Sequence, residues 1–269
     1  MYSYVDKCRK LNDIFKDITR KDVVVAFSGG VDSAVLLKTA CDFAKENDTK
    51  VYAVTMQTMM HSVKEMNFTK ETAKKIGALH RVIEINELEN AGISNNPFDR
   101  CYLCKKYMFS KICEFAESIG AETVIEGTNA DDLKVYRPGV KAIEELGIKS
   151  PLAEIGMTKK EVRQLAGEYK LKAVDKPSTP CLATRFEYGT HLDVDKFKSV
   201  EMAEEYIRTL GFYNVRLRVH NTVARIEVDE ADIDKLMSFR NDIVSFVRSL
   251  GFKYVTVDME GFISGSMDK

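Results

Sequence analysis

The chain has 269 residues and a formal net charge of −1 at pH 7, with 45% hydrophobic and 30% charged residues. This composition is ordinary for a folded globular protein, and the neutral balance gives no overall electrostatic attraction to nucleic acid. No apolar run approaches the length of about 18 residues needed to span a bilayer, and the first residues show no secretory signal, so we expect a cytoplasmic protein.

The predicted elements begin with strands that alternate with helices, the pattern of a doubly wound parallel sheet in an α/β protein. Apolar runs with β-branched residues predict the strands, and apolar residues at helical spacing predict the helices. The expected strands are 22–27, 51–55, 79–85 and 122–125, and the expected helices are 3–19, one from 33 onward, 62–76 and 102–119.

The pattern changes after about residue 185, where we expect a smaller C-terminal α+β domain. Two alternating strands on either side of His220-Asn221-Thr222 indicate a hairpin. We therefore divide the chain into a first domain of residues 1–188 and a second domain of residues 189–269. The second domain is expected to contain helices 193–210 and 230–249 and strands 215–219, 223–228 and 253–258.

The most informative motif, Ser28-Gly29-Gly30-Val31-Asp32-Ser33, follows the apolar run 23–27 and opens a helix. Its glycines let the backbone approach a phosphate, and the N–H groups at the helix start point toward that phosphate. Ser28 and Ser33 add hydroxyl donors, and Asp32 is suited to holding Mg²⁺ against a polyphosphate. The turn lacks the lysine of the Gly-x-x-x-x-Gly-Lys loop. The motif therefore predicts a phosphate-binding turn that is distinct from the Gly-x-x-x-x-Gly-Lys loop.

Two further segments follow predicted strands, and ligands of parallel sheets bind at the carboxyl ends of strands. Met56 follows the second strand, and Glu126–Asp132, which includes Gly127, follows the fourth. We expect this second segment to cover the other side of ATP and to add a metal ligand. A plain surface turn is the alternative reading.

The sequence contains six cysteines, for which disulfides are not expected in a cytoplasmic protein. Three of them lie on helix-like stretches and are expected to be small core residues. These three are Cys8, Cys41 and Cys113.

The other cysteines, Cys101, Cys104 and Cys181, lie in polar, loop-like sequence and call for a chemical explanation. The C-x-x-C pair alone fits a redox dithiol, half of a zinc site or part of an iron–sulfur site. Three cysteines without a fourth suit a [4Fe–4S] cluster with one iron open to a sulfide or a substrate. Three thiols without a metal remain the alternative.

An arginine set marks the second domain. Arg216 and Arg218 alternate on one strand and share a face, and Arg225 lies on the next strand. Guanidinium groups on one face suit a phosphate or carboxylates, and a solvated sheet face is the alternative. The candidate binders of substrate phosphate or carboxylate are Arg185, Arg216, Arg218, Arg225 and an acidic residue on the preceding helix, Glu204 or its neighbour Glu205.

The segment Lys176–Arg185, together with Ser28–Ser33, Glu126–Asp132, Tyr136–Gly139 and Gly261–Ser266, resembles the LarE family. These are ATP-dependent sulfur transferases of nickel-pincer cofactor synthesis, in the PP-loop ATP pyrophosphatase superfamily. The resemblance implies an adenine nucleotide alpha hydrolase-like fold for 1–188 and a substrate-binding domain for 189–269. The chain departs from the family pattern at Glu187, where many relatives have proline.

The resemblance also implies a reaction. ATP, with Mg²⁺ on Asp32, adenylates a carboxylate of pyridinium-3,5-biscarboxylic acid mononucleotide, and sulfur then displaces AMP. Cys181 matches the sulfur-carrying position. The presence of Cys101 and Cys104 resembles the three-cysteine branch, in which a [4Fe–4S] cluster on Cys101, Cys104 and Cys181 carries the donor sulfide.

Several expectations about ligands and partners follow. ATP is expected to contact Ser28, Gly29, Gly30, Asp32, Ser33, Met56 and Gly127. The partners implied are a small nucleotide substrate, sulfide or another sulfur donor, and further copies of the chain in a homo-oligomer. A tRNA thiolase of the same superfamily is the alternative function, although nucleic acid is not expected from the charge balance and no added RNA-binding domain is recognisable.

Overall fold

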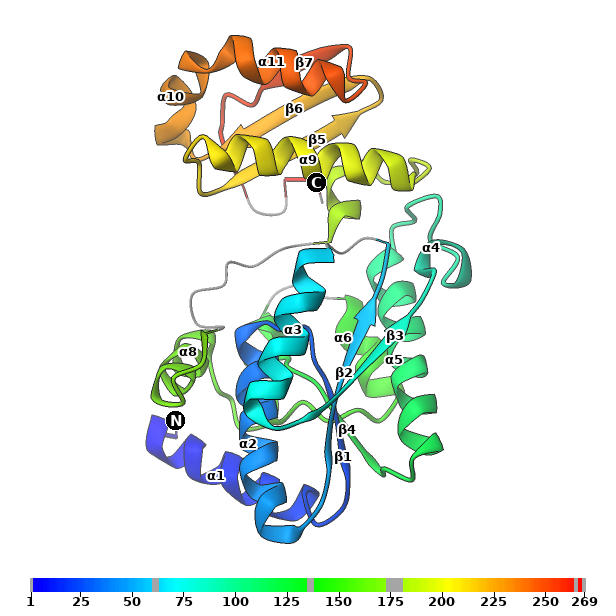
Figure 1. The fold of residues 1–269 in the computed structure, drawn as a ribbon, viewed down its shortest axis with the longest axis vertical. Coiled ribbons are helices and arrows are strands. Elements are labelled where there is room, and N and C mark those ends of the chain that lie inside the picture. The colour runs from blue at the N-terminus through cyan, green and yellow to red at the C-terminus, as the bar shows by residue number, and fades with distance from the viewer. Residues whose placement is uncertain (1, 60–62, 135–137, 173–180, 264–265, 268–269) are drawn as a thin grey trace. The chain divides into compact units, whose positions relative to one another are not determined.

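The computed structural model describes residues 2–59, 63–134, 138–172, 181–263 and 266–267. The chain forms two compact units, drawn in Figure 1. Unit 1 comprises Met1–Ile93 and Asp99–Thr179, and unit 2 comprises Ser94–Phe98 and Pro180–Lys269. The sequence-based boundary between residues 188 and 189 lies inside unit 2, because the preceding residues are held there. Phe186, for example, forms an isolated bridge with Val219.

Unit 1 is built on a sheet of parallel strands, which confirms the predicted α/β class. The strands are β1 (Val23–Ala26), β2 (Val51–Gln57), β3 (Leu79–Glu84) and β4 (Thr123–Ile125), in the order β3-β2-β1-β4. The central strand β1 is apolar throughout because helices cover both faces of the sheet. Val23 and Val25 belong to one buried cluster and Val24 to another.

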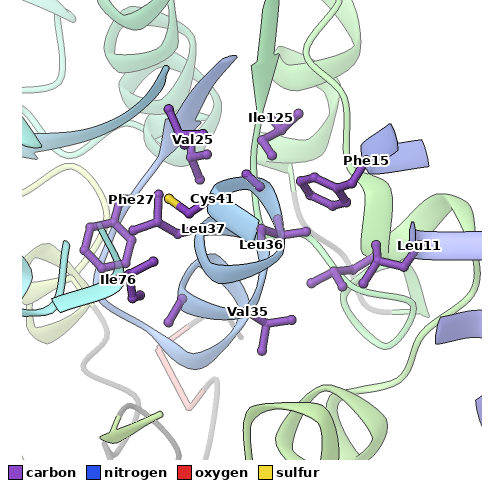
Figure 2. Packing of buried hydrophobic residues seen from close by; sticks show 14 of the residues in the cluster. Leu11, Phe15, Val25, Phe27, Val35, Leu36, Leu37, Cys41, Ile76 and Ile125 are labelled. Carbon is purple, nitrogen blue, oxygen red and sulfur yellow. The ribbon is translucent and has the colours of Figure 1, made fainter. Parts of the chain in front are cut away.

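The first cluster surrounds α2 (Val31–Asn47), which is buried along most of its length (Figure 2). Leu36 and Leu37 are fully buried there among side chains from the neighbouring helices. Those neighbours are α1 (Tyr4–Ile18), α3 (Val63–Ile76) and α8 (Lys159–Glu168). The second cluster involves α5 (Arg100–Ser118) and α6 (Pro138–Glu145). Helices therefore pack on both faces of the sheet, as in a doubly wound fold.

Several short elements are absent from the sequence-based prediction. They include α8, which opens with a capping box in which Thr158 and Glu161 bond to each other's backbone N–H groups. The Thr-x-x-Glu spacing in the sequence is a start signal for a helix at this position. The other elements are α4 (Glu87–Asn90), η1 (Asp132–Lys134), α6, α7 (Pro151–Glu154) and η3 (Leu182–Arg185).

Unit 2 contains a sheet in the order β5-β6-β7, where β5 pairs antiparallel and β7 parallel with β6. The predicted hairpin is confirmed, although His220 belongs to the strand and Asn221 takes the left-handed conformation at φ 54°. The elements are α9 (Val194–Thr209), β5 (Val215–His220), β6 (Val223–Val228), η4 (Glu230–Asp232), α10 (Ile233–Ser238), α11 (Arg240–Ser249) and β7 (Tyr254–Val257).

The predicted continuous helix over 230–249 is wrong. Phe239 separates α10 from α11 with φ −96° and ψ 9°, and its ring packs edge-on against Phe212 at 6.3 Å between centroids. Together α10 and α11 form the crossover that brings β7 parallel to β6. In the part of the chain that the structure describes, no helix has the length and apolar character of a membrane span.

Candidate active site

The turn between β1 and α2 forms the centre of the site in unit 1. Gly29 has φ 73°, a conformation that glycine adopts at little cost, and Gly30 caps the helix. The Ser33 hydroxyl donates to the Gly30 carbonyl at 3.1 Å, and the Gly30 N–H lies 3.4 Å from the Ser28 hydroxyl. These bonds hold the turn at the N-terminus of α2, where the first backbone N–H groups of a helix have no partner within the helix. This is the arrangement of an anion site.

The segment after β4 packs directly against this turn. A Cβ atom on Gly127 would lie 3.1 Å from both Asp32 Cβ and Ser33 N, so only glycine fits without a shift. Asn129 donates its side-chain N–H to Asp32 Oδ1 at 3.2 Å. Glu126 is buried and accepts hydrogen bonds from Thr128 N and the Ser150 hydroxyl. The segment therefore lies directly beside the turn, and its expected role in covering one side of ATP stays a prediction.

A pocket of about 330 Å³ lies at the carboxyl ends of the strands in unit 1. Its volume is in the range of sites for small organic ligands. The pocket has a polar part formed by the turn and an apolar part suited to a flat base. The predicted residues that line it are Ser28, Asp32, Ser33, Met56 and Gly127, and the apolar part also includes Val54, Met66, Met108, Phe109 and Ile112.

Two further charged side chains line this pocket: Lys105, which the sequence did not predict, and Asp132, which belongs to the predicted Glu126–Asp132 segment. Lys105, on the second turn of α5, lies 3.9 Å from the Glu126 carboxylate, and Asp132 belongs to the lining near Asp32. Lysine suits a phosphate, and two carboxylates suit Mg²⁺, which prefers oxygen ligands and keeps several waters. The donor set around Asp32 is therefore compatible with a nucleotide and its metal.

The C-x-x-C cysteines lie in the first turns of α5, in unit 1. Cys101 is exposed and receives a hydrogen bond from Arg100 Nη2 at 3.7 Å, and Cys104 is partly buried. Cys181 stands at the start of η3 in unit 2, where its carbonyl accepts the Thr184 hydroxyl at 2.8 Å. Among the described residues, no group of three or more His, Cys, Asp or Glu side chains is arranged to hold a metal ion. The convergence of these three thiols thus stays a prediction.

The remaining cysteines agree with a packing role. Cys41 belongs to the core around α2, while Cys8 and Cys113 pack at the edges of the two clusters. Burial raises the pKa of all three thiols, that of Cys41 to about 11, so they stay protonated and poorly nucleophilic.

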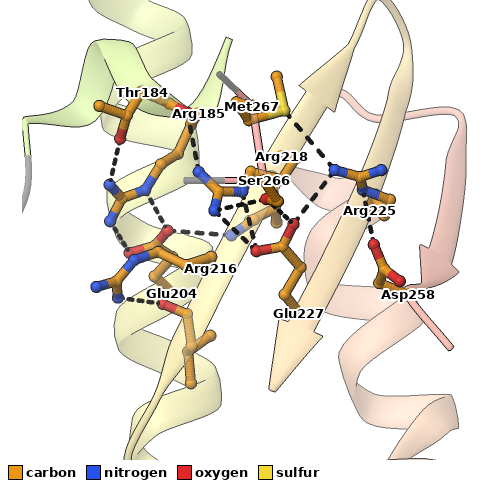
Figure 3. A network of polar contacts seen from close by, with 12 residues as sticks. Thr184, Arg185, Glu204, Arg216, Arg218, Arg225, Glu227, Asp258, Ser266 and Met267 are labelled. Carbon is orange, nitrogen blue, oxygen red and sulfur yellow. Dashed lines mark hydrogen bonds and ion pairs between the residues drawn. The ribbon is translucent and has the colours of Figure 1, made fainter. Parts of the chain in front are cut away.

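Unit 2 concentrates arginines and glutamates on one face of its sheet, as Figure 3 shows. Arg185, 1% exposed, donates from Nε and Nη2 to the two oxygens of Glu204 at 2.8 and 3.0 Å. Glu204 also accepts from Arg208 at 2.7 Å and from the Leu217 N–H at 3.0 Å. Its neighbour Glu205 is exposed. Of the two glutamates considered from the sequence, Glu204 is the one at the arginines.

A second buried glutamate organises the other arginines. Glu227 pairs with Arg218 at 2.9 Å and with Arg225 at 3.2 Å, and Arg225 also lies 3.5 Å from Asp258. Arg218 and Arg225 are direct partners across β5 and β6, which confirms that these arginines share a face. Their charges are therefore already balanced by carboxylates within unit 2.

Arg216 differs from the other three. Its Nη1 donates a hydrogen bond to the Val215 carbonyl at 2.8 Å, and its guanidinium lies 5.1 Å from the centre of the Phe262 ring. Within the described residues, no carboxylate lies in salt-bridge distance of it. Burial, aided by the charge of Arg185, lowers the pKa of Arg216 to about 10, so it stays protonated at neutral pH. It is the arginine of this face best able to accept an outside anion.

Comparison with known proteins identifies the family. Residues 3–102 match the PP-loop domain family. The chain is 38% identical over 253 residues to the pyridinium-3,5-bisthiocarboxylic acid mononucleotide synthase of Lactiplantibacillus plantarum, covering 94% of this chain and 90% of that protein. The chain belongs to the LarE family.

Two other relatives show how far the similarity extends, one along nearly the whole chain and one along only part of it. An uncharacterized protein of Synechocystis is 37% identical over 265 residues, covering 98% of this chain and 97% of its own length. A tRNA-specific 2-thiouridylase of Rickettsia bellii is 24% identical over 196 residues, covering 58% of this chain and 52% of the relative. The tRNA thiolase alternative thus has only a distant, partial match. As a LarE-family protein with a PP-loop domain, the chain is an ATP-dependent sulfur transferase.

The structure describes only part of the sequence segments that resemble the LarE family. Residues Lys176–Pro180 before Cys181 lie outside the described residues, as do Tyr136 and Arg137. Asn129 belongs to the segment Glu126–Asp132 that the sequence predicted beside ATP, but no local motif marks its hydrogen bond to Asp32. Lys105 could have been suspected, because it lies one residue after the C-x-x-C pair on the same predicted helix.

Proposed function

We propose that this protein uses ATP to convert a carboxylate of pyridinium-3,5-biscarboxylic acid mononucleotide into a thiocarboxylate. The observation that carries this proposal is the similarity, over nearly the whole chain, to a synthase named for the bisthiocarboxylic acid product. The nucleotide pocket of unit 1 and the arginine face of unit 2 support it, because the reaction needs a site for ATP and an anchor for a phosphorylated substrate.

In the first step, a carboxylate oxygen of the substrate attacks the α-phosphorus of ATP. A new C–O–P link forms, the bond to the β-phosphate oxygen breaks, and pyrophosphate leaves. The N–H groups of the Gly29–Gly30 turn and the Ser33 hydroxyl would stabilise the leaving group, and the apolar part of the pocket near Met56 would hold adenine. Asp32 and Asp132 would hold Mg²⁺, which neutralises charge on the departing pyrophosphate.

In the second step, hydrosulfide sulfur attacks the activated acyl carbon. The C–S bond forms, the C–O bond to AMP breaks, and the proton passes to solvent. The thiols of Cys101, Cys104 and Cys181 would hold a [4Fe–4S] cluster, since two of them lie one turn apart on α5 and three thiolates leave one iron open. Such a cluster, when bound, would supply the sulfide for repeated turnover.

Substrate anchoring would fall mainly to Arg216. Arg185, Arg218 and Arg225 are paired with carboxylates inside unit 2, so we assign them the role of building and orienting the anionic site. Glu204 would act as their counter-charge and not contact the substrate directly, because its side chain is 3% exposed.

The decisive experiment is an anaerobic incubation of the purified protein with ATP, Mg²⁺, sulfide and the biscarboxylic acid mononucleotide. Mass spectrometry should detect a thiocarboxylate, and pyrophosphate should appear in step with it. A parallel incubation with unmodified tRNA should yield no thiolated nucleoside. Thiolation of tRNA without a thiocarboxylate product would overturn the proposal. Iron and acid-labile sulfide content would support the cluster, whereas zinc would contradict it.

Replacing Cys181 tests the division into two steps. We expect Cys181→Ala to lose sulfur transfer and cluster iron while retaining pyrophosphate release, because the nucleotide site lies within unit 1. The matched control is Cys113→Ala, since Cys113 packs against the core cluster of α5. Full sulfur transfer by Cys181→Ala would show that this thiol is not needed.

We also propose that the protein acts in the cytoplasm as a homo-oligomer. A reducing compartment suits a chain with six cysteine residues. Size-exclusion chromatography with light scattering would measure the mass in solution against the 30.5 kDa of one chain.

A further inference from the structure

The phosphate-binding turn lacks a lysine in its own sequence, but the fold brings one to its aspartate. Lys159 Nζ forms an ion pair with Asp32 Oδ2, although the two residues are 127 positions apart in the chain. The lysine side chain is 38% exposed and the aspartate side chain 17%. Asp32 Oδ1 accepts from Asn129, so both oxygens of this carboxylate are engaged.

Lys159 is the first residue of α8, and its position is set by contacts on both sides. Its backbone N–H donates to Asp131 Oδ2 at 2.9 Å, and the neighbouring Met157 carbonyl accepts from Ala130 N at 2.9 Å. The start of α8 is thus attached to the same segment that supplies Asn129 to Asp32. These contacts form a closed ring of three chain segments around one carboxylate.

The opposite side of the α8 start is anchored as well. Glu161 completes the capping box with Thr158, and its carboxylate receives Lys7 Nζ from α1 at 2.8 Å. The neighbouring residue Lys160 is exposed. These two adjacent lysines therefore have different surroundings: Lys159 forms an ion pair with Asp32 of the nucleotide site, whereas the side chain of Lys160 faces solvent.

We propose that Lys159 is a positioning residue that competes with the divalent cation for Asp32. An ammonium and a metal ion on the same carboxylate repel each other, so Lys159 weakens binding of the metal alone. Phosphate oxygens offer the ammonium another partner, so this penalty falls when nucleotide and metal arrive together. Lys159 thereby makes metal binding depend on the nucleotide. The inference rests on the metal role of Asp32 in the proposed function.

The test measures Mn²⁺ binding without nucleotide by electron paramagnetic resonance, which needs no turnover. For a partly exposed ion pair, we expect Lys159→Met to bind Mn²⁺ about fivefold more tightly than the native protein. Lys159→Arg should restore native affinity because it keeps the charge. Lys160→Met should match the native protein. An equal affinity for Lys159→Met and Lys160→Met would overturn the proposal.

A series of double variants distinguishes the competition by Lys159 from the metal-binding role of Asp32, on which it rests. In an Asp32→Asn background, Lys159→Met should no longer alter Mn²⁺ affinity, since the shared carboxylate is gone. If Asp32→Asn alone leaves Mn²⁺ binding at the native level, the metal role of Asp32 fails. If Asp32→Asn weakens binding but Lys159→Met has no effect, only the competition fails. Thermal denaturation of Lys159→Gln checks the fold, and this variant should show the same gain in affinity as Lys159→Met.

Discussion

Neutralising Glu204 is the sharpest test of how unit 2 holds its arginines. In Glu204→Gln the side chain keeps its size, but Arg185, at 1% exposure, loses its counter-charge. Removing one partner of a buried ion pair costs about 3–5 kcal/mol, because the remaining charge stays desolvated. Arg208, the other arginine paired with Glu204, is partly exposed and therefore loses less stabilisation. We expect the free energy of unfolding to fall by about 3 kcal/mol, the lower end of that range.

The pH dependence of this loss has a definite sign. Burial by itself raises the pKa of Glu204, but the hydrogen bonds and charge of Arg185 and the charge of Arg208 outweigh it and lower the pKa. The stabilisation is therefore complete above the unfolded pKa of about 4.3 and is lost as the pH falls through the lower folded pKa. The gap between native protein and Glu204→Gln should be full at neutral pH and should shrink in strong acid.

Urea unfolding followed by circular dichroism measures the global effect at each pH. Hydrogen–deuterium exchange localises it, because the Leu217 N–H donates to Glu204 Oε1 at 3.0 Å and should exchange faster in the variant. The control is Glu260→Gln, the same change at an exposed position of unit 2, which should stay within about 0.5 kcal/mol of the native protein. Equal losses for Glu204→Gln and Glu260→Gln, or a gap that widens in acid, would refute the reasoning.

Two glycine substitutions test the nucleotide pocket. Gly127→Ala should weaken binding of a fluorescent ATP analogue at least about tenfold, because the new Cβ would lie 3.1 Å from Asp32 Cβ and must open the site. Gly139→Ala should weaken it by a similar factor of about ten, since its Cβ would lie 2.6 Å from Lys105 Cδ and displace that lysine. Gly167→Ala, where nothing lies within 4 Å, is the matched control and should bind normally. Native affinity in either of the first two variants would contradict the geometry.

Local sequence was enough to predict the nucleotide turn and the fold class. Glycines between a β-branched run and a helix dictate the turn at Gly29 through backbone conformation alone. Alternating strands and helices likewise imply a parallel sheet, because a parallel connection needs a crossover. The shared face of Arg216 and Arg218 followed from the two-residue period of a strand. Each of these inferences depends on residues close together in the chain.

The sequence can distinguish Glu204 from Glu205 as the glutamate at the arginines, once it is known which face of the helix is buried. Val200, Ala203 and Ile207 form the buried stripe of α9, and Glu204 falls on that stripe. A glutamate at such a position must be paired with a buried cation, because burying it alone costs too much free energy. The sequence indicated that cations were near, but only the fold showed that Arg185 is the partner.

Tertiary structure alone decided how distant segments meet around Asp32. Lys159, Asn129 and Gly127 reach this carboxylate from two other parts of the chain, and no local motif encodes such contacts. Their positions depend on how α8 and the segment after β4 pack against α2, which is settled by burial and capping over the whole unit. The sequence by itself therefore determined which chemistry the turn can perform. The packed fold determined which charges surround it, because electrostatic partners are set by distance in space and not by distance along the chain.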